Sequence, residues 1–440
     1  MGLGEVSISR TIGKSVLTIR RYLQNKPQLA PKNEVVAEIG SLTLEFTRLS
    51  QITGDPRWYD AVQRISDVFA EEQSKTLLPG LWPLTVNALT LNMHEDTRFT
   101  VGGMADSVFE YLSKEHILLA GRTPQYATMH NAMVQTVKSY LLFEPLLPPS
   151  SLETDDQPLS PLFLGSLKVD KNKHTRTLDP QGEHLTCFAG GMLALGARAL
   201  RSSLPDAKYQ EDMGVARRLT DGCIWSYFNT PTGIGPEIFH TSPCRSGRDA
   251  ITSGAEPDGL GNRGDCRWDE DRWLMSLRKV PGNVNKLEDG RRQWAKDRKL
   301  LGGFTEVNDA KYILRPEAIE SVFVLYRTTG NEALREHAWK MFQAIVRFTR
   351  TDIAFASLPD VMTTPGDNFD TSAEGGQAPN EGVRQMDSME SFWTAETLKY
   401  FYLVFEDPDV VSLDEFVLNT EAHPMRYRKM GGGRTRGNGG

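Results

Sequence analysis

The chain has 440 residues, 24% of them charged, and a formal net charge of −7 at pH 7. The acidic balance argues against a nucleic-acid-binding surface, and no run approaches the roughly 18 apolar residues of a transmembrane helix. The length permits two or three average domains, or one large helical domain with a sizeable core.

Helical periodicity organises most of the chain after a basic N-terminal segment. The first predicted helix begins near Val36 and stops at the turn Thr53-Gly54-Asp55-Pro56. A second, amphipathic helix is predicted over residues 57–72. The same pairing of helices then recurs. Further helices are predicted over residues 102–119, 126–142, 184–200, 213–228, 316–326, 331–349 and 383–405.

Each predicted pair combines an apolar, small-residue-rich first helix with a more amphipathic second helix. This alternation is typical of concentric layers, in which inner helices are buried on all sides and outer helices expose one face to solvent. The predicted fold class is all-α with minor β structure. Short strands are expected at 166–169 and 234–240, among two long irregular stretches at 145–182 and 241–310.

The sequence L-R-P-E-A-I-E-S, residues 314–321, places charged side chains at the beginning of a helix. Pro316 suits the first helical position, and Glu317 then lies near the positive end of the helix dipole, with Glu320 on the same face. Arg315 lies just outside the helix and can pair with either carboxylate. Taken alone, this pattern is typical of a well-capped surface helix.

Carboxylates recur at or inside the first helix of each pair. An acid within an apolar helix face is costly to bury unless it is paired or bound to a cation, so a single such acid is usually a core salt bridge. Seven or eight of the nine candidates are expected to converge on the axis of a helix ring and to form a negatively charged pocket. The candidates are Glu45, Asp106, Glu110, Glu237, Glu317, Glu320, Glu390, Glu396 and Glu421.

Such a pocket suits two kinds of chemistry. It can hold a hard cation, which takes oxygen ligands, or perform glycoside hydrolysis, which needs one protonated and one ionised carboxyl. Glu317, beside Arg315 at a helix N-terminus, is expected to be ionised and therefore to be the better base. Asp106 and Glu110 share a helix face, so their repulsion is expected to raise one of their pKa values.

Four cysteines lie in the middle third of the chain: Cys187, Cys223, Cys244 and Cys266. None forms a C-x-x-C pair, and their spacing fits no common zinc pattern. The even count is compatible with two disulfides, for which three pairings exist, or with four unrelated buried thiols.

Seven segments, in order, resemble the class I α-1,2-mannosidases (glycoside hydrolase family 47), and most closely the fungal members. The segments are L-T-L-E-F-T-R-L-S-Q-I-T-G-D-P, G-G-M-A-D-S-V-F-E-Y-L, H-L-T-C-F-A-G-G-M-L-A-L-G-A, P-T-G-I-G-P-E-I-F-H, L-R-P-E-A-I-E-S-V-F-V-L-Y-R, M-E-S-F-W-T-A-E-T-L-K-Y-F-Y-L and F-V-L-N-T-E-A-H-P. They span residues 34–424, the expected catalytic domain. Residues 1–33 are expected to be an atypical segment or linker, and residues 425–440 a disordered Gly-rich basic tail.

The resemblance implies an (α/α)7 barrel of inner and outer helices, closed at one end by a β-hairpin. It implies a mannosyl-oligosaccharide 1,2-α-mannosidase, which removes terminal α-1,2-linked mannose from high-mannose N-linked oligosaccharides with inversion. It also implies a bound Ca²⁺ ion and a monomeric chain. The partner is therefore a glycan on a glycoprotein, with no nucleic acid and no transmembrane segment in this chain.

The resemblance implies catalytic and substrate-binding roles for individual residues. Glu317 matches the general base, and Asp106 matches a candidate proton donor. Phe392, rather than Trp393, matches the ring beneath the bound mannose. The implied substrate-binding residues are Arg315, His184, Phe392, Glu110, Glu45, Glu237, Glu320, Glu396 and Glu421.

The implied calcium site has one direct protein ligand, Thr420, which binds through its hydroxyl and carbonyl oxygens. The other ligands would be sugar hydroxyls and waters. The waters would be held by Glu45, Glu237, Glu320, Glu396 and Glu421.

Two further features follow from the resemblance. Cys187 and Cys223 match the family disulfide, which leaves Cys244 and Cys266 as a second bridge. Disulfides imply an oxidising compartment, here the secretory pathway: Golgi, endoplasmic reticulum or secreted. Met104 stands where endoplasmic-reticulum members that remove a single mannose carry arginine, so an apolar residue here indicates the broader trimming class.

One departure from the family pattern concerns the general acid. Family catalytic domains begin well upstream of the first matching segment, and that region supplies a Phe-Glu-x-x-x-Arg motif whose glutamate is the favoured acid. Residues 1–33 contain no such motif, and nine predicted helices stand against the family's fourteen. The barrel is therefore expected to be incomplete at its N-terminus, with any signal or anchor lost. The alternatives are a catalytically impaired mannose-glycan-binding relative in glycoprotein quality control, and a truncated gene-model fragment.

Overall fold

The computed structural model describes most of the chain. The expected N-terminal segment (1–33) and tail (425–440) lie largely outside the described residues, although Pro424–Arg426 form a strand. No helix of the described part is long and apolar enough to cross a membrane. The described residues are 29–155, 157–173, 175–247, 266–282, 288–363 and 382–427.

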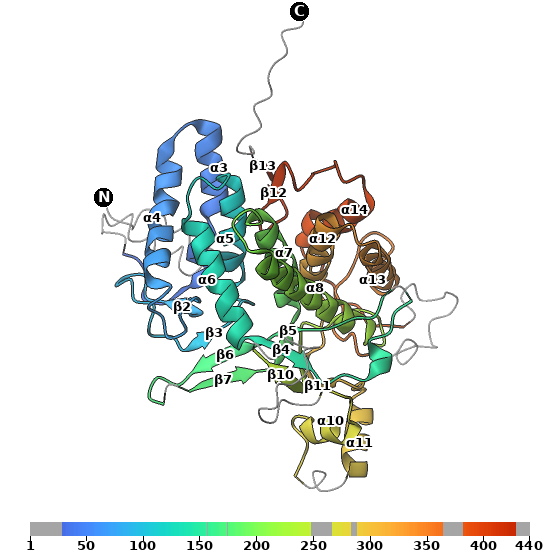
Figure 1. Cartoon of the computed structure of the whole chain (residues 1–440). Helices are drawn as coiled ribbons and strands as arrows, with labels where there is room; N and C mark the ends of the chain where they lie inside the picture. The colour runs from blue at the N-terminus through green and yellow to red at the C-terminus, as the bar shows by residue number, and fades with distance from the viewer. Residues whose placement is uncertain are drawn as a thin grey trace, which may run out of the picture.

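Consecutive helices pack on each other in pairs, as Figure 1 shows. A short helix, α2 (Val36–Gly40), precedes the first pair. The pairs are α3 (Thr43–Thr53) with α4 (Pro56–Glu72), α5 (Asp106–Leu118) with α6 (Gln125–Tyr140), α7 (Phe188–Ala199) with α8 (Asp206–Phe228), and α12 (Glu317–Thr329) with α13 (Ala333–Thr349).

The first helices of these pairs form the inner layer. Helix α5 packs on α3 and α7, α7 packs on α12, and α12 packs on α14 (Leu398–Phe405). The inner helices α7 and α12 are buried around most of their circumference: every residue from Phe188 to Ala197 of α7 and from Ala318 to Tyr326 of α12 is buried. The first inner helix, α3, buries only Thr43, Leu44 and Thr47. The outer helix α4 buries only Val62, Ser66 and Phe69. The predicted concentric layers are therefore confirmed.

The turn between α3 and α4 follows directly from its sequence. Gly54 adopts a left-handed φ of 72°, and its N–H donates to the carbonyl of Ser50, which ends α3. The Asp55 side chain accepts a hydrogen bond from the backbone N–H of Arg57, and Pro56 occupies the first turn of α4. Glycine at the C-terminal cap, aspartate at the N-terminal cap and proline behind it are each the residues favoured at these positions.

A β-hairpin, β12 (Phe416–Leu418) and β13 (Pro424–Arg426), covers one end of the inner layer. Val417 joins a small core with Leu44 of α3 and Tyr111 of α5. Figure 1 places this hairpin at the upper end of the helices and most of the other strands at the lower end.

The lower end carries three antiparallel sheets of three strands. The sheet nearest the acids has the order β11 (Phe304–Asp309), β9 (Ile238–Thr241), β8 (Gln181–Glu183). The second has the order β3 (Arg98–Phe99), β6 (Ser166–Val169), β7 (Arg176–Asp179), and the third β10 (Pro243–Ser246), β4 (Leu142–Pro145), β5 (Phe163–Leu164). A two-stranded ribbon pairs β1 (Glu34–Val35) with β2 (Thr85–Val86), and short helical turns η2 (Pro149–Ser151) and η3 (His184–Cys187) complete this end.

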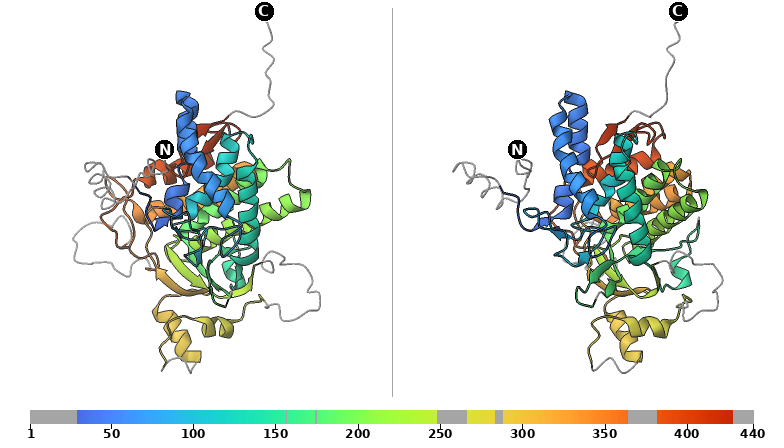
Figure 2. Two further views of the ribbon diagram at one scale, coloured as in Figure 1. Left: turned by 90° about the vertical axis from the view of Figure 1, so that its left-hand side faces the viewer. Right: turned by 60° about the vertical axis from the view of Figure 1, so that its left-hand side comes forward.

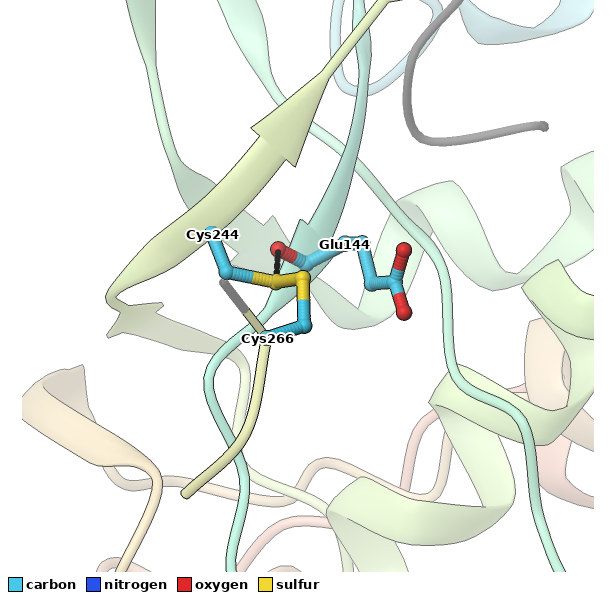
Figure 3. A group of neighbouring side chains, drawn as sticks. All are labelled: Glu144, Cys244 and Cys266. Carbon is cyan, nitrogen blue, oxygen red and sulfur yellow. Dashed lines mark hydrogen bonds between the residues drawn. A yellow bond between two sulfur atoms is a disulfide. The ribbon is translucent and has the colours of Figure 1, made fainter. Parts of the chain in front are cut away.

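Two disulfides fasten the structure, Cys187–Cys223 and Cys244–Cys266, so both predicted pairings are confirmed. The second, shown in Figure 3, ties β10 to the segment that forms α10 (Glu270–Ser276) and α11 (Glu288–Asp297). This segment has its own small core around Trp273 and Leu274. Figures 1 and 2 show α10 and α11 beyond the sheets, at the end away from the β12–β13 hairpin.

The carboxylate of Glu144 and the two sulfurs of the Cys244–Cys266 bridge lie within 4.8 Å of one another. The sulfurs are already bonded to each other. Arg245 and Arg218 approach Glu144 Oε2 at 3.4 and 3.6 Å. The group is therefore a disulfide beside an ion-paired carboxylate, and we assign it no metal.

Three predicted helices are wrong in extent, and one of them, predicted over 213–228, already begins at Asp206 as α8. The first is divided into α2 and α3, because α2 turns away at Gly40, where an added Cβ would meet Val108 Cγ2 of α5 at 2.3 Å. The last predicted helix, 383–405, is helical only from Trp393, through a π-helical turn, η4 (Trp393–Thr397), into α14. Two residues of the part that is not helical, Met386 and Ser388, instead form backbone hydrogen bonds with Ser357. This pairing competes with the hydrogen bonds of a helix.

The strand predicted at 166–169 is confirmed as β6, and the strand predicted at 234–240 is present only as the shorter β9. The two stretches predicted to be irregular contain further regular structure. Strands β5 to β8 lie within or at the end of the first stretch, and β10, α10, α11 and β11 lie within the second. These elements are too short to show a clear periodic spacing of apolar residues. Contacts with other parts of the chain supply most of their stability.

Candidate active site

The start of α12 is held in an unusual backbone conformation. Leu314 is fully buried and has a left-handed φ of 69°. Its carbonyl accepts a hydrogen bond of 2.6 Å from the hydroxyl of Thr397, the last residue of η4. Helix α12 itself begins at Glu317, so Pro316 is the capping residue and not the first helical residue. A strained non-glycine residue of this kind persists only where the surrounding structure enforces it.

Glu317 is oriented by a chain of buried rings. Its Oε2 atom lies 3.0 Å from Nδ1 of His184, and Nε2 of His184 lies 2.8 Å from the hydroxyl of Tyr227. An ionised carboxylate only accepts hydrogen bonds, so in the neutral ring Nδ1 donates to Glu317 and Nε2 accepts from Tyr227. Burial raises the pKa of Tyr227, which keeps its hydroxyl a donor. Oε1 of Glu317 faces the guanidinium of Arg315 at 3.6 Å, beyond hydrogen-bond distance.

Arg315 connects Glu317 to a second carboxylate. Its Nε donates to Oε2 of Glu237 at 2.6 Å, and its guanidinium lies 3.6 Å from Oε1 of Glu317. The same guanidinium lies 5.9 Å from the centre of the Phe392 ring. Trp393, by contrast, is fully buried and packs on Phe355. The structure therefore brings Phe392, and not Trp393, beside the charged groups.

Asp106 begins helix α5, and its Oδ1 accepts a hydrogen bond of 2.9 Å from the backbone N–H of Ser107. The pKa of Asp106 is raised to about 6, mainly by burial; hydrogen bonds from Ser107 oppose the rise, and the charges of Glu110 and Glu317 add to it. The expectation that one carboxyl of the Asp106 and Glu110 pair has a raised pKa agrees with this result. Desolvation, however, is the larger cause.

Sequence reasoning missed Lys114, which lies between two of the predicted acids. Its side chain is almost completely buried and pairs with Glu110 on the same helix and, at 3.2 Å, with Oε1 of Glu320 on α12. Burial lowers the pKa of Lys114, but the two carboxylates outweigh burial and leave it raised. The spacing of four residues from Glu110 was the available signal.

Glu396 lies in η4 and faces several other acids. Burial raises its pKa to about 8, with added contributions from the charges of Glu320, Glu317, Glu421 and Glu110. Because these charges act on one group, the acids from α5, α12, η4 and the hairpin turn share one electrostatic environment. The predicted convergence of acids is therefore present for Asp106, Glu110, Glu317, Glu320, Glu396 and Glu421.

Glu45 and the hairpin turn are joined through Tyr111 of α5. The Tyr111 hydroxyl donates to Oε1 of Glu45 at 2.6 Å and accepts from the backbone N–H of Thr420 at 3.3 Å. Asn419 also donates to Oε1 of Glu45, at 2.8 Å. Oε2 of Glu45 is buried without a hydrogen-bond partner, as is Oε1 of Glu237. Such oxygens are available to waters around a hard cation, so the residues present fit a calcium site.

The concentric helices and the converging carboxylates define an (α/α) barrel with an acidic centre. Residues 12–427 match the profile of Glycosyl hydrolase family 47, and the chain belongs to this family. The match begins inside the segment 1–33 that sequence reasoning had set apart. Members of this family are in general calcium-dependent.

Curated relatives and a solved structure support the assignment. The chain is 29% identical to human mannosyl-oligosaccharide 1,2-alpha-mannosidase IC over 90% of this chain and 47% of that protein. It is 29% identical to the probable mannosyl-oligosaccharide alpha-1,2-mannosidase 1B of Aspergillus niger, over 90% of this chain and 62% of that protein. The alpha-1,2-mannosidase structure from Trichoderma reesei aligns with a TM-score of 0.65 and 27% identity, over 91% of this chain and 68% of that one. The chain spans about half the length of the curated relatives it matches.

Glu115, the residue after Lys114, is a second buried ionisable residue that sequence reasoning missed. It is fully buried, its Oε1 accepts a hydrogen bond of 2.6 Å from Thr47, and its Oε2 has no hydrogen-bond partner. Burial raises its pKa to about 8, against the opposing effect of Thr47. The folded protein therefore holds a proton that the unfolded chain releases near pH 4.5.

We predict that Glu115→Gln reduces the pH dependence of stability. Protonated Glu115 contributes to the free energy of unfolding. This contribution is fully present below the pKa of Glu115 in the unfolded chain. It is lost as pH rises through the folded-state pKa of about 8, at up to about 1.4 kcal/mol per pH unit. The free energy of unfolding of the variant, relative to wild type, should rise between pH 5 and 8 in urea titrations. The exposed Glu336→Gln variant is the control, and equal pH profiles for Glu115→Gln and wild type would contradict the prediction.

Proposed function

We propose that the chain is an inverting, Ca²⁺-dependent mannosyl-oligosaccharide 1,2-α-mannosidase of the secretory pathway, acting as a monomer in N-glycan processing. It removes terminal α-1,2-linked mannose from high-mannose N-linked oligosaccharides. The names of the relatives support the substrate class. The observation that carries the proposal is the pair of unlike carboxyls, Glu317 held by His184 and Arg315, and Asp106 with its raised pKa, because glycoside hydrolysis needs one base and one acid.

In the proposed reaction Glu317 is the general base. Because Oε2 is engaged by His184, Oε1 accepts the proton of the attacking water, whose oxygen forms the new bond to the anomeric carbon. The bond from that carbon to the leaving oxygen breaks, and the leaving oxygen takes a proton from the acid, for which we propose Asp106. Attack and departure on opposite faces of the sugar invert the anomeric centre.

Arg315 and Phe392 supply the proposed contacts to the mannose ring. Glu237 fixes the guanidinium from one side, so that it lies beside the Phe392 ring and offers donors next to an apolar face. The side chain of Met104 is 44% exposed immediately before α5. An apolar side chain there is compatible with removal of several mannose residues, leading toward a five-mannose glycan.

Calcium would be held by Thr420 through its hydroxyl and carbonyl oxygens, with waters held by the surrounding glutamates. The water-holding residues would be Glu45, Glu237, Glu320, Glu396 and Glu421. When bound, the ion supplies positive charge and oxygen coordination that orient sugar hydroxyls. A cation there would also lower the pKa of Glu396 by offsetting the repulsion from its neighbours.

We predict that Glu317→Gln keeps the fold and removes turnover. The amide retains a similar shape and a carbonyl oxygen for His184, but it is not a base that accepts the water proton. Release of mannose from a nine-mannose glycan, measured with calcium and with chelator, is the assay. The Glu336→Gln variant is the control. Unchanged turnover in Glu317→Gln would show that the base is assigned wrongly, and glycan binding without any wild-type turnover would favour a non-catalytic lectin.

We predict that Asp106 sets the alkaline limb of the pH profile. If Asp106 donates the proton, kcat/KM falls about tenfold per pH unit above its pKa of about 6. Asp106→Asn should lower turnover at pH 5 by a factor of about 10² to 10⁴ and abolish this limb. A wild-type profile that stays flat from pH 5 to 8 would exclude Asp106 as the acid.

We predict that Thr420→Ala weakens calcium binding. A ligand that binds the native state stabilises it, so added Ca²⁺ should raise the wild-type melting temperature and raise that of Thr420→Ala less. Differential scanning fluorimetry over a calcium titration measures the effect, with the exposed Thr90→Ala variant as control. Equal shifts in Thr420→Ala and wild type would place the calcium site elsewhere.

A further inference from the structure

A hollow of about 490 Å³ lies outside the acidic centre, between the α10–α11 segment, strand β11 and the loop that follows α13. Its volume falls within the range of small-ligand sites. Charged and polar side chains from both sides line it, among them Arg278, Lys279, Arg298, Glu306, Asn308 and Asp360.

The charges around this hollow largely neutralise one another. Arg278 Nε lies 3.3 Å from Oε2 of Glu306, and Lys279 pairs with the other oxygen of the same carboxylate. Arg278 also reaches Oδ1 of Asp179 at 3.2 Å. A strongly anionic ligand would need an excess of positive charge, whereas balanced pairs offer both donors and acceptors. A neutral polyhydroxyl ligand can form hydrogen bonds with both the donors and the acceptors.

One wall of the hollow contains a buried acceptor with unused capacity. Oε2 of Glu306 is buried and takes part in no hydrogen bond, although it lies within ion-pair distance of Arg278. Buried polar atoms are normally satisfied, so this oxygen calls for a donor from a water or a ligand. Two residues further along the same strand, Asn308 is held by His240, whose Nδ1 lies 2.6 Å from its Oδ1.

The hollow extends along the strand that leads to the acidic centre. Five residues after the end of β11, the chain reaches Leu314, and Arg315 follows. Ala310 lines the hollow, and the carbonyl of the next residue, Lys311, accepts the backbone N–H of Glu237 at 3.0 Å. A ligand in the hollow would therefore lie beside the segment that carries the proposed base. Figure 1 shows the α10–α11 segment on the same side as the sheets that precede His184 and Arg315.

The far wall of the hollow is anchored to the body of the protein. Trp273 Nε1 donates to the carbonyl of Phe304 at 3.0 Å, and the backbone N–H of Arg278 donates to the carbonyl of Thr305 at 3.2 Å. The Cys244–Cys266 bridge fixes the beginning of the segment. A wall held in place before binding loses little entropy on binding.

We propose that this hollow binds a second arm of the branched oligosaccharide while a terminal mannose occupies the acidic centre. The inference rests on the proposed function, because it assigns the hollow to the same neutral sugar substrate. It makes the hollow a determinant of affinity for large glycans and leaves the chemistry of bond cleavage to the acidic centre.

The test compares a large and a small substrate. The double variant Lys279→Ala/Arg298→Ala removes two lining cations, and Arg292→Ala/Lys296→Ala removes two exposed cations of α11 that do not line the hollow. For a nine-mannose glycan, the first variant should raise KM by about five- to tenfold, the size expected from one or two lost hydrogen bonds. For α-1,2-mannobiose, which fills only the acidic centre, its kcat/KM should equal that of wild type.

The outcomes separate this inference from the proposed function. Unchanged KM for the nine-mannose glycan, or an equal loss on both substrates, overturns the role of the hollow. An equal rise in KM for the nine-mannose glycan in the Arg292→Ala/Lys296→Ala control also overturns the role of the hollow, because it would indicate a general charge effect. If wild type cleaves neither substrate, the proposed function fails, and calorimetric titration with the same glycan still tests the hollow. Weaker binding by the lining variant supports the inference, and equal binding overturns it.

Discussion

The ion pairs of Lys114 make the acidic centre compatible with a packed helical core. Charged groups are costly to bury unless they are paired, and this lysine pairs with one carboxylate from its own helix and with Glu320 from α12. It thereby joins two inner helices across the centre. Without this cation, Glu110 and Glu320 would lie close together in an apolar surrounding with no opposite charge between them, and both would tend to be protonated.

Backbone strain marks the same centre. Leu314, Met104 and Ala422 are non-glycine residues with left-handed φ values of 69°, 73° and 57°. Each stands within three residues of a proposed functional residue. At Leu314 the constraint is visible, because Thr397 of the π-helical turn holds its carbonyl. π-Helical turns and strained residues both concentrate at functional sites, where side-chain direction matters more than local stability.

The layers and the acids were predictable from the sequence, because both depend on residue spacing. Inner helices such as α7 appear in the sequence as continuous apolar runs. The turn Thr53-Gly54-Asp55-Pro56 contains the residues favoured at a C-terminal cap, an N-terminal cap and the first turn of a helix. The polar partners that orient the acids were not predictable. Tyr227 and Lys114 are ordinary residues of helical segments, and only the packing of α8 beside η3 and the approach of Lys114 to Glu320 on α12 give them their contacts. The backbone pairing of Met386 and Ser388 with Ser357, after which the last helical segment begins only at Trp393, is likewise tertiary.

The Cys187–Cys223 bridge has a consequence for when the site becomes complete. His184 lies three residues before the first cysteine, and Tyr227 lies four residues after the second, so the covalent bond joins the two segments whose side chains form the hydrogen bond behind Glu317. Oxidation of these thiols thus fixes the spacing of a ring pair that orients a carboxylate. Maturation of the proposed base is thereby coupled to the redox state of the compartment in which the chain folds.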